Sequence, residues 1–357
     1  EGINKMNKEI SVIPSARSLI ESFRNMGHDF HTAIADLVDN SIAANSTEIK
    51  IMISIDNNEP FVLISDDGDG MDRETIDEAM RFGSNSSYNT NDLGKYGLGL
   101  KTASLSFCDK LTVFSKSKPL ADKKSKLYIR RWDLPYVYQK DDWIVNTLEL
   151  NDLNNIENKI VSKFFSEKKG TIILWSDMKS RNSMSLLYDD NPILREKQLS
   201  VLISETRQHL SLVFHRYMEG SVKGKVRLKI FVNECELEPW DPFFKTEKET
   251  KFMEPKSFYI YDENGKKQEI IFSPVVIPRE DSVAFSGNKK NAMEADSKNN
   301  QQGFYFYRND RLIKAGGWGG STGNAGIFKI EEHYKLLRIA VDFHPSLDKA
   351  FNLDISK

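Results

Sequence analysis

Apolar residues recur at helical spacing in several stretches of the chain. Residues 15–27 begin with Ser15, a residue type that caps helices, and end at Gly27, so they predict a short capped helix. Residues 29–44 carry the same spacing without a helix breaker and predict an uninterrupted helix. Three further helices are expected at residues 72–81, 100–107 and 192–217.

Other runs favour strands. Residues 49–55 and 61–65 are β-like and flank residues 56–60, which are rich in turn formers, so the pair is expected to form a hairpin. Helices that alternate with an antiparallel sheet predict an α/β sandwich, and the long helix at residues 192–217 is expected to begin a second region. Further strands are expected at residues 111–116, 127–132, 143–150, 171–175, 225–232, 268–276, 303–307 and 336–343.

Length and composition narrow the class of protein. The 357 residues exceed the size at which one hydrophobic core usually stops growing, so two packed domains are expected. Lysine and arginine number 50 against 52 aspartates and glutamates, a net charge of −2, which excludes a polycation that binds nucleic acid through bulk charge. Any nucleic-acid binding must therefore be local.

The cysteines and the apolar runs predict a cytoplasmic protein without a membrane partner. Cys108 and Cys235 stand far apart, with no second cysteine or histidine at metal-ligand spacing, which argues against a zinc knuckle or a disulfide framework. The longest apolar runs, such as residues 51–55, are far too short to cross a bilayer.

The first motif with possible chemistry is Asp36-Leu37-Val38-Asp39-Asn40, inside the helix predicted at residues 29–44. Asp36 and Asn40 are four positions apart and share one helix face, where a carboxylate could orient water while a carboxamide ligates Mg²⁺. A solvated polar face produces the same pattern, so the motif alone does not decide between them.

The second motif is Asp66-Asp67-Gly68-Asp69-Gly70-Met71, directly after a predicted strand. Its glycines allow a sharp turn and a close approach to a ligand, and a carboxylate at the strand end can accept a hydrogen bond from an amine. A calcium-binding EF-hand loop is excluded, because a loop that starts at Asp67 puts Met71 at a ligand position. A loop that starts at Ser65 puts Ile76 where the bidentate glutamate belongs. An ordinary acidic turn remains an alternative.

The third motif is the glycine-rich stretch at residues 94–102, which opens a predicted helix. Its backbone amides, the helix N-terminus and Lys101 favour a polyphosphate guest. A Walker A loop is excluded because Leu100 follows Gly99 where the lysine belongs, and a Rossmann fingerprint is excluded because Thr102 stands at the third glycine position. A plain glycine-rich turn remains the alternative.

The order of these motifs is more specific than any one of them. In this order the chain resembles the GHKL ATPases, the superfamily of gyrase B, heat-shock chaperones, histidine kinases and MutL that shares the Bergerat fold, and within it most of all the MORC proteins. Residues 33–41 resemble the N box and residues 66–71 the G1 box. Residues 81–84 and 94–104 resemble the lid and the G2 box, Gly170-Thr171 begins a G3-like strand, and residues 307–314 resemble the MORC transducer strand.

The resemblance implies an α+β architecture in two domains. Residues 1–185 would form a Bergerat α/β sandwich that binds ATP, and residues 186–357 a transducer domain like ribosomal protein S5. Recognisable motifs run from about residue 30 to the end of the chain.

The resemblance also assigns roles to residues. Asp66 aligns with the acceptor of the adenine amine, with Gly70 and Thr171 beside the base, and Asn40 aligns with the magnesium ligand. Gly68 and Met71 are further expected nucleotide-binding residues. Lys357 is nominated as the basic residue that senses the γ-phosphate, with Lys349 as second choice. The implied lid and phosphate-binding residues are Gly83, Ser84, Lys95, Tyr96, Gly97, Leu98, Gly99, Leu100, Lys101 and Thr102.

One position departs from the family pattern. The usual general base is a glutamate, and Asp36 stands in its place. Aspartate is one methylene shorter, and general-base geometry tolerates little error, so hydrolysis is expected to be slow. Asp39 is an alternative base, but its offset on the helix is expected to aim it elsewhere.

As a whole, the resemblance implies a MORC- and MutL-like ATPase that binds ATP and Mg²⁺ under a lid over residues 83–101 and forms an ATP-dependent homodimer through residues 7–23. The dimer would act as a clamp on DNA or on another partner. The alternative is an ATP-sensing dimerisation module with little hydrolysis, whose output lies in a further C-terminal domain or effector protein. A histidine kinase is disfavoured because no histidine-bearing dimerisation helix precedes residues 33–41.

Two other features invite a functional interpretation. Trp318, within a glycine-rich turn at residues 315–320, is a minor candidate for contact with the nucleotide or a partner subunit. A basic cluster on a predicted hairpin could hold a phosphodiester backbone, although a solvated hairpin is the favoured interpretation. The cluster comprises Lys116, Lys118, Lys123, Lys124, Lys126, Arg130 and Arg131.

Overall fold

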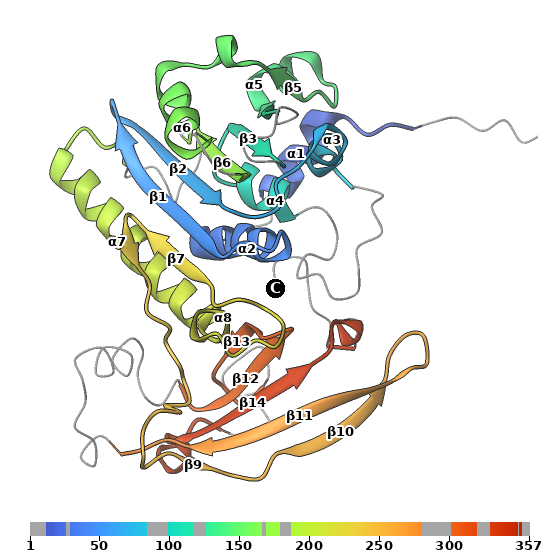
Figure 1. Cartoon of the computed structure of the whole chain (residues 1–357), viewed down its shortest axis with the longest axis vertical. Helices are drawn as coiled ribbons and strands as arrows, with labels where there is room; N and C mark the ends of the chain where they lie inside the picture. The colour runs from blue at the N-terminus through green and yellow to red at the C-terminus, as the bar shows by residue number, and fades with distance from the viewer. Residues whose placement is uncertain are drawn as a thin grey trace, which may run out of the picture.

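The fold has two β-sheets with helices packed around the first (Figure 1). The computed structural model describes residues 12–25, 29–83, 99–117, 126–165, 169–178, 187–279, 301–319, 329–348 and 350–351. None of the helices in these ranges combines the length and the apolarity that a bilayer crossing requires.

The first sheet has the strand order β5-β4-β3-β6-β2-β1-β7-β8. The predicted hairpin is confirmed: β1 and β2 pair antiparallel, and Asn57 and Asn58 turn the chain with φ of 49° and 65°. Asparagine tolerates this left-handed region better than most residues, which explains the tight connection. The strands are β1 (Glu48–Asp56), β2 (Glu59–Asp66), β3 (Lys110–Lys116), β4 (Tyr128–Asp133), β5 (Asn146–Leu148), β6 (Gly170–Ser176), β7 (Lys229–Val232) and β8 (Cys235–Glu236).

Helices cover both faces of this sheet. Successive side chains of β2 point to opposite faces of the sheet. Val62 and Ile64 pack in the core with α2, whereas Leu63 packs with Ile160 of α6. Burial on both faces explains why β2 is a nearly continuous apolar run rather than an alternating one. The helices are α1 (Ala16–Arg24), α2 (Phe30–Ala43), α3 (Arg73–Met80), α4 (Gly99–Leu105), α5 (Leu134–Lys140) and α6 (Asn155–Phe165).

Four of these helices match the sequence predictions and two were not predicted. Ser15 caps α1 by accepting a hydrogen bond from the amide of Ser18 at 3.2 Å. Helix α6 begins with a side-chain cap too, since Asn154 accepts from the amides of Ile156 and Glu157, both at 2.9 Å. The expected strand at residues 143–150 is reduced to β5, because residues 150–152 form the 3₁₀ helix η1 (Leu150–Asp152).

The long helix predicted at residues 192–217 is present as α7 (Pro192–Val213) and α8 (His215–Glu219), which meet at Phe214. The strand expected at residues 225–232 does not open a separate sheet. It is β7, which pairs parallel with β1 and extends the first sheet. The domain boundary at residues 185 and 186 stays a prediction, and the first sheet contains strands from both sides of it.

The second sheet has the order β10-β11-β14-β12-β13, with β9 beside β11. Strands β12 and β14 are parallel, and the other neighbours are antiparallel. Its likeness to ribosomal protein S5 stays a prediction. The elements are β9 (Lys251–Phe252), β10 (Lys256–Tyr261), β11 (Lys267–Val276), β12 (Gly303–Arg308), β13 (Arg311–Ala315), β14 (Leu337–Phe343) and the 3₁₀ helices η4 (Glu332–Tyr334) and η5 (Pro345–Leu347).

The structure bears on two minor functional interpretations. Trp318 is buried in the second sheet's core, where its indole Nε1 donates to Oε1 of Gln302 at 2.9 Å, so it does not project toward a ligand. In the basic cluster, Arg130 pairs with Asp77 and Arg131 with Glu157. These two arginines are engaged within the fold. Lys118, Lys123 and Lys124 lie outside the described residues, so the interpretation of the cluster as a whole stays a prediction.

Candidate functional site

The end of β2 places Asp66 at the junction of three elements. Its carboxylate accepts hydrogen bonds from Ser41 Oγ on α2 at 2.9 Å, from the Gly68 amide at 3.0 Å and from the Thr171 amide of β6 at 3.3 Å. Burial raises the pKa of Asp66, and these hydrogen bonds oppose the rise because they favour the charged form. The site is therefore a partly buried carboxyl group held in a fixed orientation.

The glycines of the loop after β2 are required by close backbone approaches. A Cβ atom at Gly68 would lie 2.7 Å from the carbonyl oxygen of Ala44 at the end of α2. Gly70 has φ of 65°, and a Cβ atom there would lie 2.1 Å from the carbonyl oxygen of Lys116. The loop thus packs closely against the backbone at the end of α2 and at the end of β3. Only glycine fits at residue 70, because its φ is positive and a Cβ atom would clash with backbone.

A second network ties the same loop to β3 and β6. Ser115 Oγ accepts from the Met71 amide at 2.8 Å and lies 2.9 Å from Thr171 Oγ1. The structure therefore brings together Asp66, Gly68, Gly70, Met71 and Thr171, all of which were predicted to bind the nucleotide. Ser41 and Ser115, which complete the two networks, were not predicted as site residues. Ser41 carried a signal, since it ends the N-box-like sequence, whereas nothing local marked Ser115.

Helix α2 carries Asp36, Asp39 and Asn40. Asp36 and Asp39 are 6% and 1% exposed, whereas Asn40 is exposed to solvent. Arg311 of β13 pairs with Asp39, with Nε 2.7 Å from Oδ2, and its Nη2 atom lies 3.5 Å from Oδ1 of Asp36. Arg311 thus contacts both carboxylates, and the expected difference in direction between Asp36 and Asp39 stays a prediction. Arg311 itself was not predicted as a functional residue.

Helix α4, which packs against α2, carries Gly99, Leu100, Lys101 and Thr102. Lys101 is buried, and its Nζ donates to the carbonyl oxygen of Ala79 in α3 at 2.8 Å. Burial lowers the pKa of Lys101 to about 8. The described conformation thus holds this ammonium against α3. Gly83 follows α3 with φ of 67°, in the region that favours glycine.

Several predicted residues lie outside the described part of the chain, and their roles stay predictions. They are the lid and phosphate residues Ser84, Lys95, Tyr96, Gly97 and Leu98, and the two candidate γ-phosphate sensors Lys349 and Lys357.

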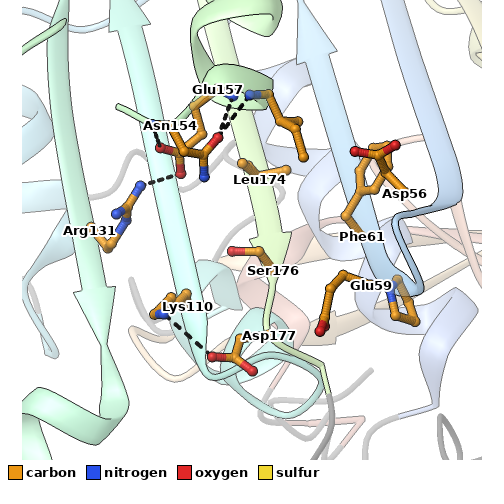
Figure 2. A pocket seen from close by; sticks show the side chains of 12 residues that line it. Asp56, Glu59, Phe61, Lys110, Arg131, Asn154, Glu157, Leu174, Ser176 and Asp177 are labelled. Atoms are coloured by element: carbon orange, nitrogen blue, oxygen red, sulfur yellow. Dashed lines mark hydrogen bonds and ion pairs between the residues drawn. The ribbon is translucent and has the colours of Figure 1, made fainter. Parts of the chain in front are cut away.

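A cavity of about 300 Å³ opens on the other face of the first sheet (Figure 2). Its lining includes Phe61, Leu174 and Ile156, which belong to the α6 side of the sheet. Four of the charged groups at its wall form two ion pairs: Arg131 with Glu157, and Lys110 with Asp177 at 3.4 Å (Figure 2). This cavity is separate from the network at Asp66, which adjoins α2.

Comparison with known proteins agrees with this geometry. Residues 28–171 match the family model described as histidine kinase-, DNA gyrase B-, and HSP90-like ATPase. The matched region carries the Asp66 network and α2 and is similar to GHKL-type ATPase domains, and the predicted α+β fold class is confirmed.

The relatives are MORC proteins. Protein MICRORCHIDIA 7 of Arabidopsis thaliana is 27% identical over 183 residues, which cover 48% of this chain and 25% of that protein. ATPase morc-1 of Caenorhabditis elegans is 38% identical over 85 residues, which cover 24% of this chain and 10% of that protein. The matched segments thus span a quarter or less of the length of these relatives. The resemblance to the MORC branch of the GHKL ATPases is confirmed.

Proposed function

We propose that this chain binds ATP with Mg²⁺ at the Asp66 network and uses binding and slow hydrolysis to gate the formation of a homodimer. The observation that carries the proposal is the partly buried carboxyl group of Asp66, held by Ser41, Gly68 and Thr171 at a point where three elements meet. A partly buried acceptor in a fixed orientation suits recognition of the exocyclic amine of adenine.

The phosphates would lie toward α4, next to α2. Amides of Gly97, Gly99 and Leu100 and the ammonium of Lys101 are the proposed partners, with the lid of residues 83–101 closing over them. Lys101 would have to exchange its bond to Ala79 for one to phosphate, and the phosphate charge would favour its protonated form. Lid closure orders a glycine-rich segment, so contacts to the γ-phosphate must offset the lost conformational entropy.

The donor chemistry at Asn40 fits magnesium. Its carboxamide is exposed on α2, one turn beyond Asp36, and Mg²⁺ binds through few protein oxygens together with phosphate and water. When bound, the ion would neutralise charge on the phosphate oxygens. Asp36 is the proposed general base for the attacking water.

A sensing module with little hydrolysis is the second candidate function. It is favoured by the short side chain of Asp36 and by the Arg311 guanidinium 3.5 Å from its carboxylate. Both features limit how freely this carboxylate can approach a water molecule. In this version ATP still drives dimerisation, and the output lies in another domain or effector protein.

Dimerisation is proposed to use the segment around residues 7–23. Its described part begins with Val12 and Ile13, which are 81% and 76% exposed and would gain from burial against a second copy. A clamp around DNA or another partner is the proposed outcome.

Calorimetry with a non-hydrolysable ATP analogue and Mg²⁺ tests the proposal. The wild type should bind the analogue, and Asp66→Asn should weaken binding by about a hundredfold, because the amide presents a donor toward the adenine amine. Asp67→Asn is the matched control, since this neighbouring carboxylate bonds to the amide of Thr47 at 2.8 Å and should leave affinity unchanged. Absence of binding by the wild type, or equal loss in both variants, would contradict the assignment.

A further inference from the structure

The hairpin of β12 and β13 is fastened to α8 by its turn. Tyr217 donates its hydroxyl to the carbonyl oxygen of Asn309 at 2.6 Å, and Arg216 pairs with Asp310 at 3.0 Å. The Arg216 guanidinium also lies 3.5 Å from the centroid of the Tyr307 ring. These contacts fix where β13 begins.

Arg311 is the first residue of β13 and projects from this fastened hairpin onto α2. Its side chain is 3% exposed, and its Nε lies 2.9 and 2.7 Å from the two carboxylate oxygens of Asp39. Its Nη2 lies 3.5 Å from Asp36. One guanidinium of the second sheet thus spans two carboxylates that stand one helical turn apart in the first domain.

This arrangement limits the orientation of both carboxylates. Ionised groups are rarely buried without partners, and the planar guanidinium offers its donors in a rigid fork. Movement of the hairpin relative to α2 would therefore leave two buried carboxylates without this cation. A ligand that shifts the position of α2 should therefore also shift the position of the hairpin, and by linkage the reverse holds too.

We propose that Arg311 is a positioning residue of the nucleotide site, supplied by the second sheet, which orients Asp36 and couples α2 to the hairpin of β12 and β13. The inference rests on the proposed function, because Asp36 matters only if nucleotide binds beside α2. It goes beyond that function by naming the contact through which nucleotide occupancy reaches the second sheet.

Arg308 provides a matched control in the same hairpin. It is buried to a similar degree, at 4% exposed, and forms a two-pronged ion pair, with Nε and Nη2 2.9 and 3.1 Å from the carboxylate of Asp348. The two arginines differ in where their ion pairs lie. The Arg308 pair stays within the second region, whereas the Arg311 pair reaches α2. Arg308→Gln therefore removes a comparable buried ion pair without touching α2.

The experiment is amide hydrogen exchange of residues 303–315, with and without the non-hydrolysable ATP analogue and Mg²⁺. In the wild type, the analogue should change exchange of the hairpin by about tenfold or more. Arg311→Gln should abolish this response while keeping affinity for the analogue within about threefold, and Arg308→Gln should keep the response. Where the wild type turns over, kcat of Arg311→Gln should fall by about tenfold or more, with KM nearly unchanged.

The outcomes separate this inference from the proposed function. If the wild type binds no analogue, the proposed function fails and the inference fails with it. If the wild type binds the analogue but exchange of the hairpin does not change, only the role of Arg311 is overturned. The same holds if both arginine variants respond like the wild type, or if both lose the response to the same extent. If Arg311→Gln does not fold, Arg311→Lys and the pair Asp39→Asn with Arg311→Gln take its place, and the same loss of response is expected.

Discussion

Ser41 of α2 donates a hydrogen bond to the carboxylate of Asp66, with 2.9 Å between the two oxygens. The contact joins the helix of the proposed magnesium and base residues to the carboxyl group of the proposed adenine site. Two motifs that are 25 residues apart in the sequence thus become one site.

Ser41→Ala should weaken nucleotide binding and lower stability. Removing this donor favours the protonated form of Asp66, so its already raised pKa should rise further, and affinity should fall most at low pH. The free energy of unfolding should drop by about 1 to 2 kcal/mol, measured by urea denaturation at pH 7. Ser65→Ala is the control, because its Oγ makes a contact of 3.5 Å to Lys50 and none with Asp66 in the described network. Equal effects of the two substitutions would argue against the Ser41 contact.

Gly70→Ala should destabilise the protein by about 3 kcal/mol, since it combines an unfavourable φ with a clash against backbone. The new Cβ would lie 2.1 Å from the carbonyl oxygen of Lys116, which cannot rotate away. Gly224→Ala is the comparison, because Gly224 has a similar φ of 77° but no atom within 4 Å of the position that a Cβ would take. It should lose only about 1 kcal/mol. Thermal or urea unfolding of both variants measures the difference, and similar losses would mean that the loop relaxes freely.

Lys101 should make stability depend on pH in a predictable direction. Its pKa is about 8 in the folded state against 10.5 for the unperturbed group, so the unfolded state binds more protons between these values. The penalty for burying the ammonium is fully present below about pH 8 and is lost as the pH rises toward 10.5. Relative to Lys101→Met, the wild type should therefore gain about 2 kcal/mol in free energy of unfolding between pH 7 and pH 10.

Urea denaturation of the wild type and of Lys101→Met at both pH values checks this, because the difference between them cancels groups that titrate equally. A constant difference would show that the ammonium is not buried as the structure has it. Lys101→Met should also bind the ATP analogue less tightly than the wild type, independently of its change in stability.

Asp36→Asn separates the two candidate functions. If the chain is an ATPase, phosphate release should fall by about a hundredfold while affinity for the ATP analogue stays nearly the same. Asp29→Asn is the control, since Asp29 precedes the same helix, is exposed and makes no capping hydrogen bond with its side chain. If the wild type and Asp36→Asn are equally inert and ATP still dimerises both, the sensing module is supported instead.

The local sequence determined the elements that carry the site. The spacing of apolar residues predicted α2, and the asparagines between two apolar runs predicted the hairpin of β1 and β2, because helix periodicity and turn preference are local properties. The order of the motifs pointed to the GHKL ATPases before any tertiary contact was known. The close backbone approaches at Gly70 explain why a glycine was needed there.

Only the tertiary structure decided which distant residues meet. Arg311 pairs with Asp39 across 272 positions of sequence, β7 joins the first sheet rather than the second, and Trp318 is buried instead of facing a ligand. No local pattern encodes these contacts, because they depend on how the two sheets pack against α2 and α8. The sequence by itself determined the parts of the proposed nucleotide site. The packing of the second sheet against the first determined that an arginine from outside the matched region reaches α2.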